Sequence, residues 1–281
     1  MNKIAEKYKS EDLGDHWKVD ETKSSFIKLL NHLCISSNNY QFFNEAISNY
    51  LLFDKTKDII VADLGAGIGW TSAILALDPR IKKIYVVDPS KNRLKIAPYV
   101  AKHFSSDSKK LVYIEGSFSN FHLPEKVDLF LLNGAFHHCD YIDMKALFLN
   151  IKLYLKINIK FSYYNFQSKK VDVYSKSKIL ISCEHHLNKY IHLWRLFKKV
   201  FFKYDNKKKI SDYNIWSSEH NRFKKEIINI FKENKLSYNF FYFNGDMIDP
   251  MLINKSKFKK FLYFYNIQAL YYYYSILEFN E

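Results

Sequence analysis

Residues 58–69 combine an apolar run with three alternating glycines, and this combination constrains the fold more than any other part of the chain. The stretch from Asp58 to Leu64 is largely apolar and has the length of a strand buried in a parallel sheet. Gly65, Gly67 and Gly69 follow it directly, and glycine lets the backbone approach a ligand where any Cβ would clash. The sequence therefore predicts a buried strand that ends in a ligand-binding loop.

A second predicted strand ends in Asp88, nineteen positions after Gly69. This spacing is expected when one βαβ unit separates a glycine loop from the carboxyl end of the next strand. A carboxylate at that position can bind the diol of a ribose. The loop and Asp88 together predict a site for a cofactor that contains a nucleoside.

The order of residues in the loop distinguishes two classes of cofactor. Dinucleotide-binding loops have the pattern G-x-G-x-x-G, in which the third glycine lets the helix pack closely while its N-terminus faces a pyrophosphate. Here an acidic residue opens an alternating glycine triplet, which resembles motif I of the class I S-adenosylmethionine-dependent methyltransferases of the small-molecule type. The resemblance implies S-adenosylmethionine as cofactor and a first set of cofactor-binding residues: Asp63, Gly65, Gly67, Gly69 and Asp88. A glycine-rich turn in an unrelated α/β protein is the alternative interpretation.

Two further βα units are predicted after the loop. Helical spacing begins at Trp70, Ser90 is a candidate helix cap, and a third strand covers Leu111 to Glu115. Next comes Ser117, where the family often has an acidic residue against the adenine amino group. Phe118 either stacks on the adenine or is a core aromatic under the loop. Both residues are counted as candidate cofactor contacts.

A fourth strand, Val127 to Leu132, delivers the segment from Asn133 to Asp140 to the same edge of the sheet. Ligands of open α/β sheets bind outside the carboxyl ends of the strands. Many small-molecule methyltransferases have a similar strand, small-residue turn and histidine pair here. The resemblance implies that Asn133 borders the methionine part of the cofactor and that His137 and His138 lie near the methyl group.

Methyl transfer from a sulfonium has an excellent leaving group, so positioning supplies much of the acceleration. A hydroxyl acceptor also needs a base, and histidine titrates near neutral pH. His138 is the first candidate, and His185, after a fifth predicted strand (Lys178 to Ser182), is the second. Structural hydrogen bonding by these histidines is the alternative. No metal site is predicted, because the histidine and cysteine residues show no known ligand spacing.

The predicted fold class is α/β: a Rossmann-like, doubly wound, seven-stranded sheet, mostly parallel with an antiparallel C-terminal strand. Residues 1–57 form a helical N-terminal extension that caps the cofactor pocket or serves as a brace. Residues 58–281 form the methyltransferase domain, and an insertion at about 156–178 replaces the Lys-Pro-Gly-Gly turn of the family. This insertion either shapes a substrate entrance or is a divergent hairpin.

The first residues are polar and show no signal segment, so a cytoplasmic location is expected. Three widely spaced cysteines argue against a disulfide scaffold. The nineteen residues 261–279 lack a basic side chain, but Asn266 and Gln268 and the many tyrosines favour a final strand over a membrane span. Any membrane association is expected to be peripheral.

A net charge of +14 is compatible with nucleic acid, with an anionic surface or with solvated lysines alone. Enzymes of this superfamily that methylate exocyclic base amines carry an Asn/Asp-Pro-Pro-aromatic segment after strand four, and Asn133-Gly134-Ala135-Phe136 lacks both prolines. This difference argues against a nucleic-acid substrate, and the predicted acceptor is a hydroxyl of a sugar, a lipid-linked intermediate or another small metabolite. The alternatives are a non-catalytic nucleotide-binding protein and a basic RNA-modifying methyltransferase.

Overall fold

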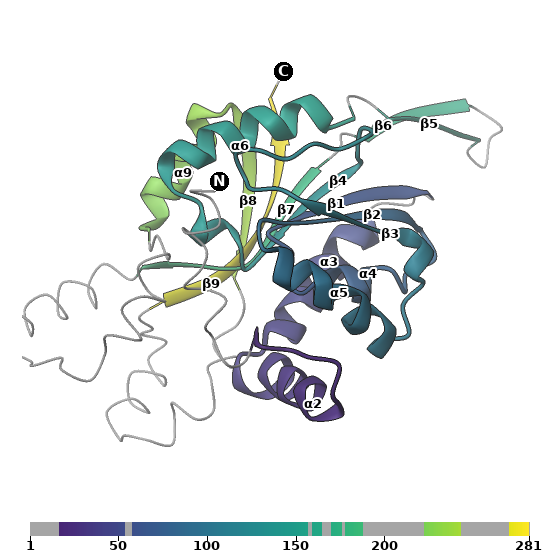
Figure 1. Ribbon diagram of the computed structural model, residues 1–281. Helices are drawn as coiled ribbons and strands as arrows, with labels where there is room; N and C mark the ends of the chain where they lie inside the picture. The colour runs from purple at the N-terminus through teal and green to yellow at the C-terminus, as the bar shows by residue number, and fades with distance from the viewer. Residues whose placement is uncertain are drawn as a thin grey trace, which may run out of the picture.

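The computed structural model describes residues 17–53, 58–156, 159–164, 170–175, 178–187, 222–242 and 270–280. Its helices and strands alternate along much of the chain (Figure 1). The helices are α2 (Lys23–Asn31), the π-helical η3 (His32–Ser36), α3 (Asn39–Phe53), α4 (Trp70–Leu75), α5 (Lys91–His103), the 3-10 turns η4 (Ser108–Lys110) and η5 (Phe136–His138), α6 (Tyr141–Tyr154) and α9 (Lys224–Glu233). The strands are β1 (Ile59–Leu64), β2 (Ile81–Asp88), β3 (Leu111–Glu115), β4 (Leu129–Asn133), β5 (Ile159–Tyr164), β6 (Lys170–Ser175), β7 (Lys178–Leu187), β8 (Leu236–Tyr242) and β9 (Leu270–Phe279).

Seven strands form one sheet in the order β3-β2-β1-β4-β7-β9-β8. The neighbours from β3 to β7 are parallel, whereas β9 is antiparallel to both β7 and β8. The chain order reverses between β1 and β4, which creates the switch point where open sheets of this kind bind their ligands. The predicted fold class is confirmed, including the antiparallel final strand.

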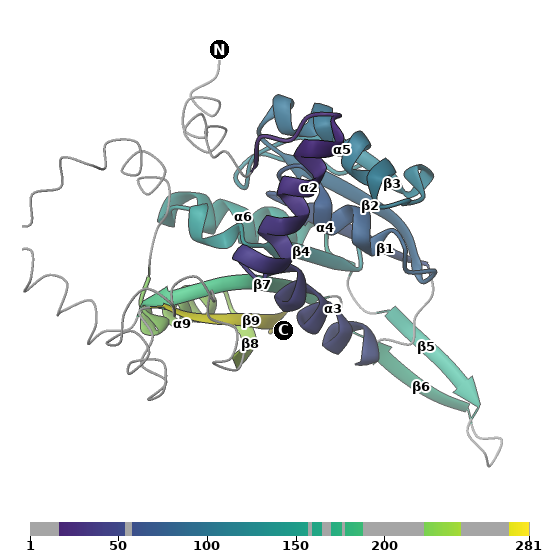
Figure 2. The ribbon, with the colours of Figure 1, turned by 90° about the horizontal axis from the view of Figure 1, so that it is seen from below.

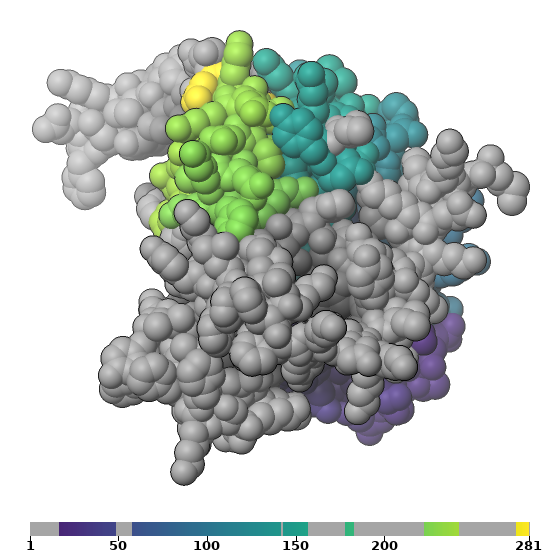
Figure 3. All heavy atoms as spheres, turned by 90° about the vertical axis from the view of Figure 1, so that its left-hand side faces the viewer, coloured from purple at the N-terminus to yellow at the C-terminus, as the bar shows by residue number. Residues whose placement is uncertain are grey.

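Helices cover both faces of the sheet (Figure 1). Residues of α2 to α5 pack with alternate residues of the strands, such as Val61 and Val86, in one core. Residues of η5, α6 and α9 pack with the opposite set, such as Ala62 and Leu132, in a second core. On the molecular surface α6 and α9 lie beside each other (Figure 3), and Tyr141 of α6 donates a hydrogen bond to Glu233 of α9. Because successive side chains of a strand point to opposite faces of the sheet, each strand contributes to both cores.

Short polar side chains begin the helices next to the sheet edge. Ser90 caps α5 by accepting from the N–H of Arg93, and Asp140 caps α6 by accepting from the N–H of Asp143. Both caps satisfy donors that have no partner within a helix. The Ser90 cap was predicted from sequence and is confirmed.

The described part of the N-terminal extension packs on the face that carries α4 and α5. The ring of Phe43 in α3 meets that of Trp70, the first residue of α4, edge to face at 5.4 Å. Phe26 in α2 stacks on His103 at the end of α5, with ring centroids 4.5 Å apart. The aromatic contact at Trp70 places α3 beside the helix that follows the glycine loop. Whether the extension caps the cofactor stays a prediction.

The segment between α6 and β7 contains a separate antiparallel hairpin, β5–β6. It leaves the sheet at the end opposite to the arrowhead of β7 (Figure 2). Both stems are held at residues 127 and 128, because the N–H of Lys156 donates to the carbonyl of Val127 and the N–H of Lys178 to that of Asp128. The insertion is therefore a hairpin at the amino edge of the strands, away from the carboxyl ends.

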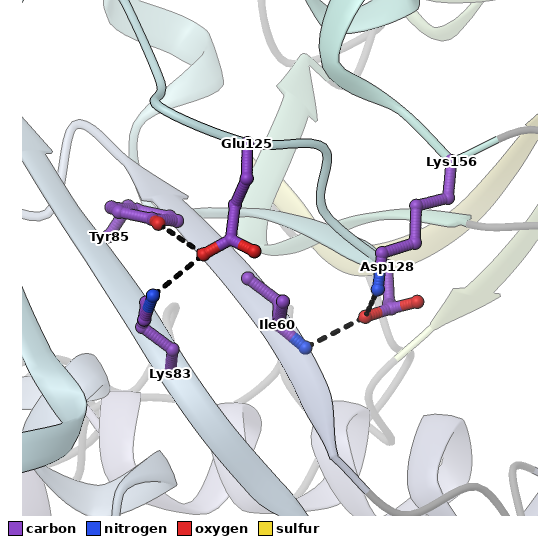
Figure 4. A network of polar contacts seen from close by, with 6 residues as sticks. All are labelled: Ile60, Lys83, Tyr85, Glu125, Asp128 and Lys156. Atoms are coloured by element: carbon purple, nitrogen blue, oxygen red, sulfur yellow. Dashed lines mark hydrogen bonds and ion pairs between the residues drawn. The ribbon is translucent and has the colours of Figure 1, made fainter.

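Two polar networks join the strands at this amino edge (Figure 4). Oδ2 of Asp128 accepts from the N–H of Ile60 at 2.8 Å and from Nζ of Lys156 at 2.6 Å. Oε1 of Glu125 accepts from Nζ of Lys83 at 2.7 Å and from the hydroxyl of Tyr85 at 2.6 Å.

Within the described ranges, no helix combines the length and apolar character required to cross a membrane.

Candidate cofactor and active site

The glycine loop is fixed to the carboxyl end of β2. The N–H groups of Gly65 and Ala66 both donate to the carbonyl of Val87, at 2.9 and 3.0 Å. The N–H of Gly67 donates to Oδ2 of Asp88 at 2.7 Å. The loop therefore has one defined conformation at the carboxyl edge.

All three glycines have positive φ, but their surroundings differ. A Cβ on Gly65 would lie 2.8 Å from the Cβ of Ala135, and one on Gly69 would lie 3.2 Å from the Cβ of Ala97. A Cβ on Gly67 would meet no described atom within 4 Å. Gly65 and Gly69 are thus required by close packing, whereas open space lies beside Gly67.

Asp63 is the only acidic residue of β1 and is almost completely buried, with 1% of its surface exposed. Strand alternation places it on the face that α4 covers, where its Oδ2 accepts from the hydroxyls of Thr71 and Ser72, both at 2.6 Å. Oδ1 has no hydrogen-bond partner among the described residues. Burial raises the pKa of Asp63 to about 6, against the two hydroxyl hydrogen bonds, and the charge of Asp88 adds to the increase.

Asp88 is also buried and connects two backbone segments. Its Oδ2 accepts from Gly67, and its Oδ1 accepts from the N–H of Ser90 at 2.8 Å. These two bonds hold the carboxylate at the carboxyl edge of the sheet, beside the glycine loop. The predicted ribose contact is compatible with this geometry and stays a prediction.

Ser117 and Phe118 lie in the turn after β3 and are both buried. The hydroxyl of Ser117 is 3.3 Å from that of Ser119. Phe118 belongs to the second core, and its Cζ would lie only 3.1 Å from a Cβ on Gly65. The ring thus supports the loop from below, which corresponds to the core alternative proposed for Phe118.

Asn133 ends β4 at the same edge, and its Oδ1 accepts from the hydroxyl of Ser182 in β7 at 2.6 Å. The N–H of Gly134 also donates to the carbonyl of Ser182, at 2.8 Å. Ser182 is fully buried, so these two bonds fix the end of β4 against β7. The side chain of Asn133 is held by its neighbour strand rather than extended into solvent.

His137 and His138 form part of η5, which is anchored by a buried ring. Phe136 is 1% exposed and packs against the rings of Phe148 and Phe231. Arg222, just before α9, donates to the carbonyl of Cys139 and lies over the Phe136 ring at 6.0 Å. The two histidine rings lie 4.1 Å apart and are partly exposed. A rigid turn therefore presents both imidazoles after β4.

His185 follows on β7, the strand next to β4. The β7–β9 register shifts between Ile181 and Glu184, so that β7 has one extra residue there. Because of this bulge, His185 occupies a register position on the face of Leu180 instead of the face of Ile181. That face carries the N-terminal helices. The side chain of His185 lies outside the described part of the chain.

The site fits a ligand with a cationic group and a nucleoside. A buried carboxylate oxygen without a donor suits a cation, and the open space beside Gly67 admits a ligand close to the backbone. The paired histidines stand at the next strand end. Fold and site together define the class I methyltransferase architecture.

Comparison with known protein families agrees with that assignment. Residues 61–158 match the family model described as methyltransferase domain. Residues 61–158 are therefore assigned to a methyltransferase domain, in agreement with the prediction from the loop pattern. The comparison with curated protein sequences gave no significant match.

Solved structures with the same fold share little sequence with the chain. Magnesium protoporphyrin IX methyltransferase from Synechocystis, with bound S-adenosylhomocysteine, has a TM-score of 0.57 at 12% identity and covers 99% of this chain and 98% of its own. The plantazolicin methyltransferase, also with S-adenosylhomocysteine, has a TM-score of 0.51 at 14% identity and the same coverage. Phosphoethanolamine N-methyltransferase 2 from Haemonchus contortus, with S-adenosyl-L-methionine, has a TM-score of 0.53 at 12% identity and covers 85% and 53%.

Four residues at the site were not predicted from the sequence: Thr71, Ser72, Ser182 and Arg222. Each acts through a partner on another element, and no local pattern marks Ser182 or Arg222. The spacing of Thr71 and Ser72 behind the loop gave one usable signal, because two adjacent hydroxyls at the start of a helix face the preceding strand.

Proposed function

We propose that the protein transfers a methyl group from S-adenosylmethionine to a small molecule, with a hydroxyl of a sugar, a lipid-linked intermediate or another metabolite as acceptor. The observation that carries the proposal is the histidine turn that follows β4 at the switch-point edge, beside the glycine loop. Bound S-adenosylmethionine supplies an electrophilic methyl group on a sulfonium. The chain has to bind the cofactor, hold the acceptor in line and remove one proton.

His138 is the proposed general base. Its turn is anchored through Phe136, and both histidine rings retain partial exposure at the strand end where an acceptor would approach. His185 is the second candidate, because β7 adjoins β4. The proposed cofactor contacts are Asp63, Gly65, Gly67, Gly69, Asp88, Ser117, Phe118 and Asn133. For Phe118 the buried ring favours an indirect role, in which it supports Gly65.

The test measures S-adenosylhomocysteine formation with a panel of sugars, sugar phosphates, phenols and isoprenoid alcohols as acceptors. With an active acceptor, His138→Ala should lower turnover at least a hundredfold and leave the Kd of S-adenosylhomocysteine within about twofold, because a base acts on the acceptor alone. His122→Ala, which removes an exposed histidine after β3, is the matched control and should retain turnover. Full activity of His138→Ala together with loss in His185→Ala would transfer the role to His185.

Full activity of both variants would exclude a histidine base and favour an acceptor that needs none, such as a neutral amine. Cofactor binding without turnover on any acceptor would favour the non-catalytic alternative. The net charge of +14 favours one further candidate, an RNA-modifying enzyme. Binding of a mixed RNA at physiological salt, with a steep loss of affinity at higher salt, would support that candidate.

A further inference from the structure

The carboxylate of Asp63 is bonded asymmetrically. Oδ2 takes both available hydroxyl donors, from Thr71 and Ser72 of α4, each at 2.6 Å. Oδ1 is equally buried and has no donor among the residues that the structure describes. Because both hydroxyls donate to the same oxygen, they fix the orientation of the Asp63 carboxylate.

Burying a carboxylate oxygen without a hydrogen-bond donor costs free energy. Either a proton or a ligand cation bound to that oxygen can remove this cost. A proton on Oδ1 would neutralise the group at low pH, although Oδ1 has no hydrogen-bond partner among the described residues. A ligand cation would satisfy Oδ1 directly, by a charge-assisted hydrogen bond. The methionine end of S-adenosylmethionine carries an ammonium group, which is a donor of this kind.

We propose that Thr71 and Ser72 are positioning residues that hold Oδ2 of Asp63, so that Oδ1 is left to accept from the cofactor ammonium and binding becomes linked to one proton. The inference rests on the cofactor assignment and adds to it the two residues that set the state of Asp63. Neither hydroxyl has to touch the cofactor, since both act through the carboxylate.

The sign of the pH effect follows from the state of Asp63. In the free protein the pKa of Asp63 is raised to about 6, chiefly by burial, so the carboxyl group is largely protonated at pH 5. An ammonium binds the ionised form, so affinity should be full above about pH 7 and should fall as the pH drops through 6. Among the described residues, the titratable group that acts on Asp63 by its charge is Asp88 at the end of β2. The negative charge of Asp88 raises the pKa of Asp63, as burial does.

The experiment measures the Kd of S-adenosylhomocysteine between pH 5 and 8.5 by calorimetry. For the wild type we expect about tenfold weaker binding at pH 5 than at pH 7.5. Methylthioadenosine, which lacks the amino-acid part, is the control ligand, and its Kd should stay constant. Asp63→Asn should bind S-adenosylhomocysteine weakly and with no dependence on pH.

The positioning role is tested by Thr71→Val and Ser72→Ala. Each loses one hydrogen bond that favours the ionised carboxylate, so the midpoint of the pH dependence should move up by about one unit. Affinity should then be about fivefold below wild type at pH 6 and return to wild type at pH 8.5. Thr71→Ser retains the hydroxyl and should match the wild type throughout.

Three outcomes would overturn the proposal: a flat profile in the wild type, an equal loss for both ligands in the variants, or a loss that high pH does not restore. For the first and third outcomes, unchanged methylthioadenosine binding would show that the nucleoside site is intact, whereas an equal loss for both ligands would mean that the hydroxyls support the whole site and not the carboxylate alone. If neither ligand binds the wild type, the cofactor assignment itself fails, which is a different result.

Discussion

Single residues in the glycine loop have distinct tasks, which the structure separates. Gly65 leaves room for the Cβ of Ala135 and for the ring of Phe118, whereas Gly67 borders open space. A sequence pattern treats these glycines as equivalent. Their contacts predict different consequences for the same substitution.

Gly65→Ala should destabilise the fold by about 2–4 kcal/mol, because the added Cβ would clash at 2.8 Å with Ala135 at a positive φ. Gly67→Ala should cost only about 1 kcal/mol, for its positive φ alone, yet should weaken cofactor binding by occupying the ligand side of the loop. Urea unfolding and the Kd of S-adenosylhomocysteine measure the two effects. Equal stability losses in the two variants would contradict this distinction.

At the scale of elements, the two networks at the amino edge differ in burial. Asp128 joins the start of β1 to the stem of the β5–β6 hairpin, and its side chain is 9% exposed. Lys83 and Glu125 form a pair with side chains 36% and 39% exposed. The pKa of Glu125 is lowered mainly by its hydrogen bond with Lys83, but solvent screens most of the energy of such a pair.

Asp128→Ala should lower the free energy of unfolding by about 2–4 kcal/mol, because the N–H of Ile60 loses its side-chain acceptor and Lys156 its partner. Lys83→Met is the control for an exposed pair and should cost less than about 1 kcal/mol. Urea denaturation at pH 7 compares them. A similar loss of unfolding free energy in the two variants would mean that burial does not decide how much these two polar networks stabilise the fold.

At the scale of the whole molecule, the site and the insertion occupy opposite edges of the sheet. The glycine loop, Asp88 and the histidine turn follow the carboxyl ends of the strands, while the β5–β6 hairpin leaves from the amino edge (Figure 2). Its stems meet at residues 127 and 128. The hairpin therefore extends from the edge of the sheet opposite to the candidate site and does not cover that site.

Replacing residues 157–177 by a short Gly-Ser linker should leave the Kd of S-adenosylhomocysteine within twofold, because both stems are already held at Val127 and Asp128. Turnover on an active acceptor should also be retained. Calorimetry and a turnover assay check this. Loss of turnover with unchanged cofactor binding would show instead that the insertion contributes to acceptor binding, which was the other alternative.

The sequence by itself determined the order of the core elements and their buried faces. Apolar runs and glycines are local patterns, so β1, β2 and β3 and the Ser90 cap could be predicted close to their observed bounds. The final strand could be predicted because the polar residues among 261–279, together with the many tyrosines, favour a strand over a membrane span. Asp63 was found because it opens the glycine triplet, Asp88 because it ends a strand, and the histidine turn because it follows one.

Only the tertiary structure decided how these residues are bonded. The hydroxyls of Thr71 and Ser72 meet Asp63 because α4 folds back onto β1, and Ser182 reaches Asn133 because β7 adjoins β4. The bulge in β7 shifts the register positions of Glu184 and His185 by one residue from those that simple alternation along the sequence predicts. Such contacts depend on residues brought together across the sheet, and a local pattern carries no information about a partner on another element.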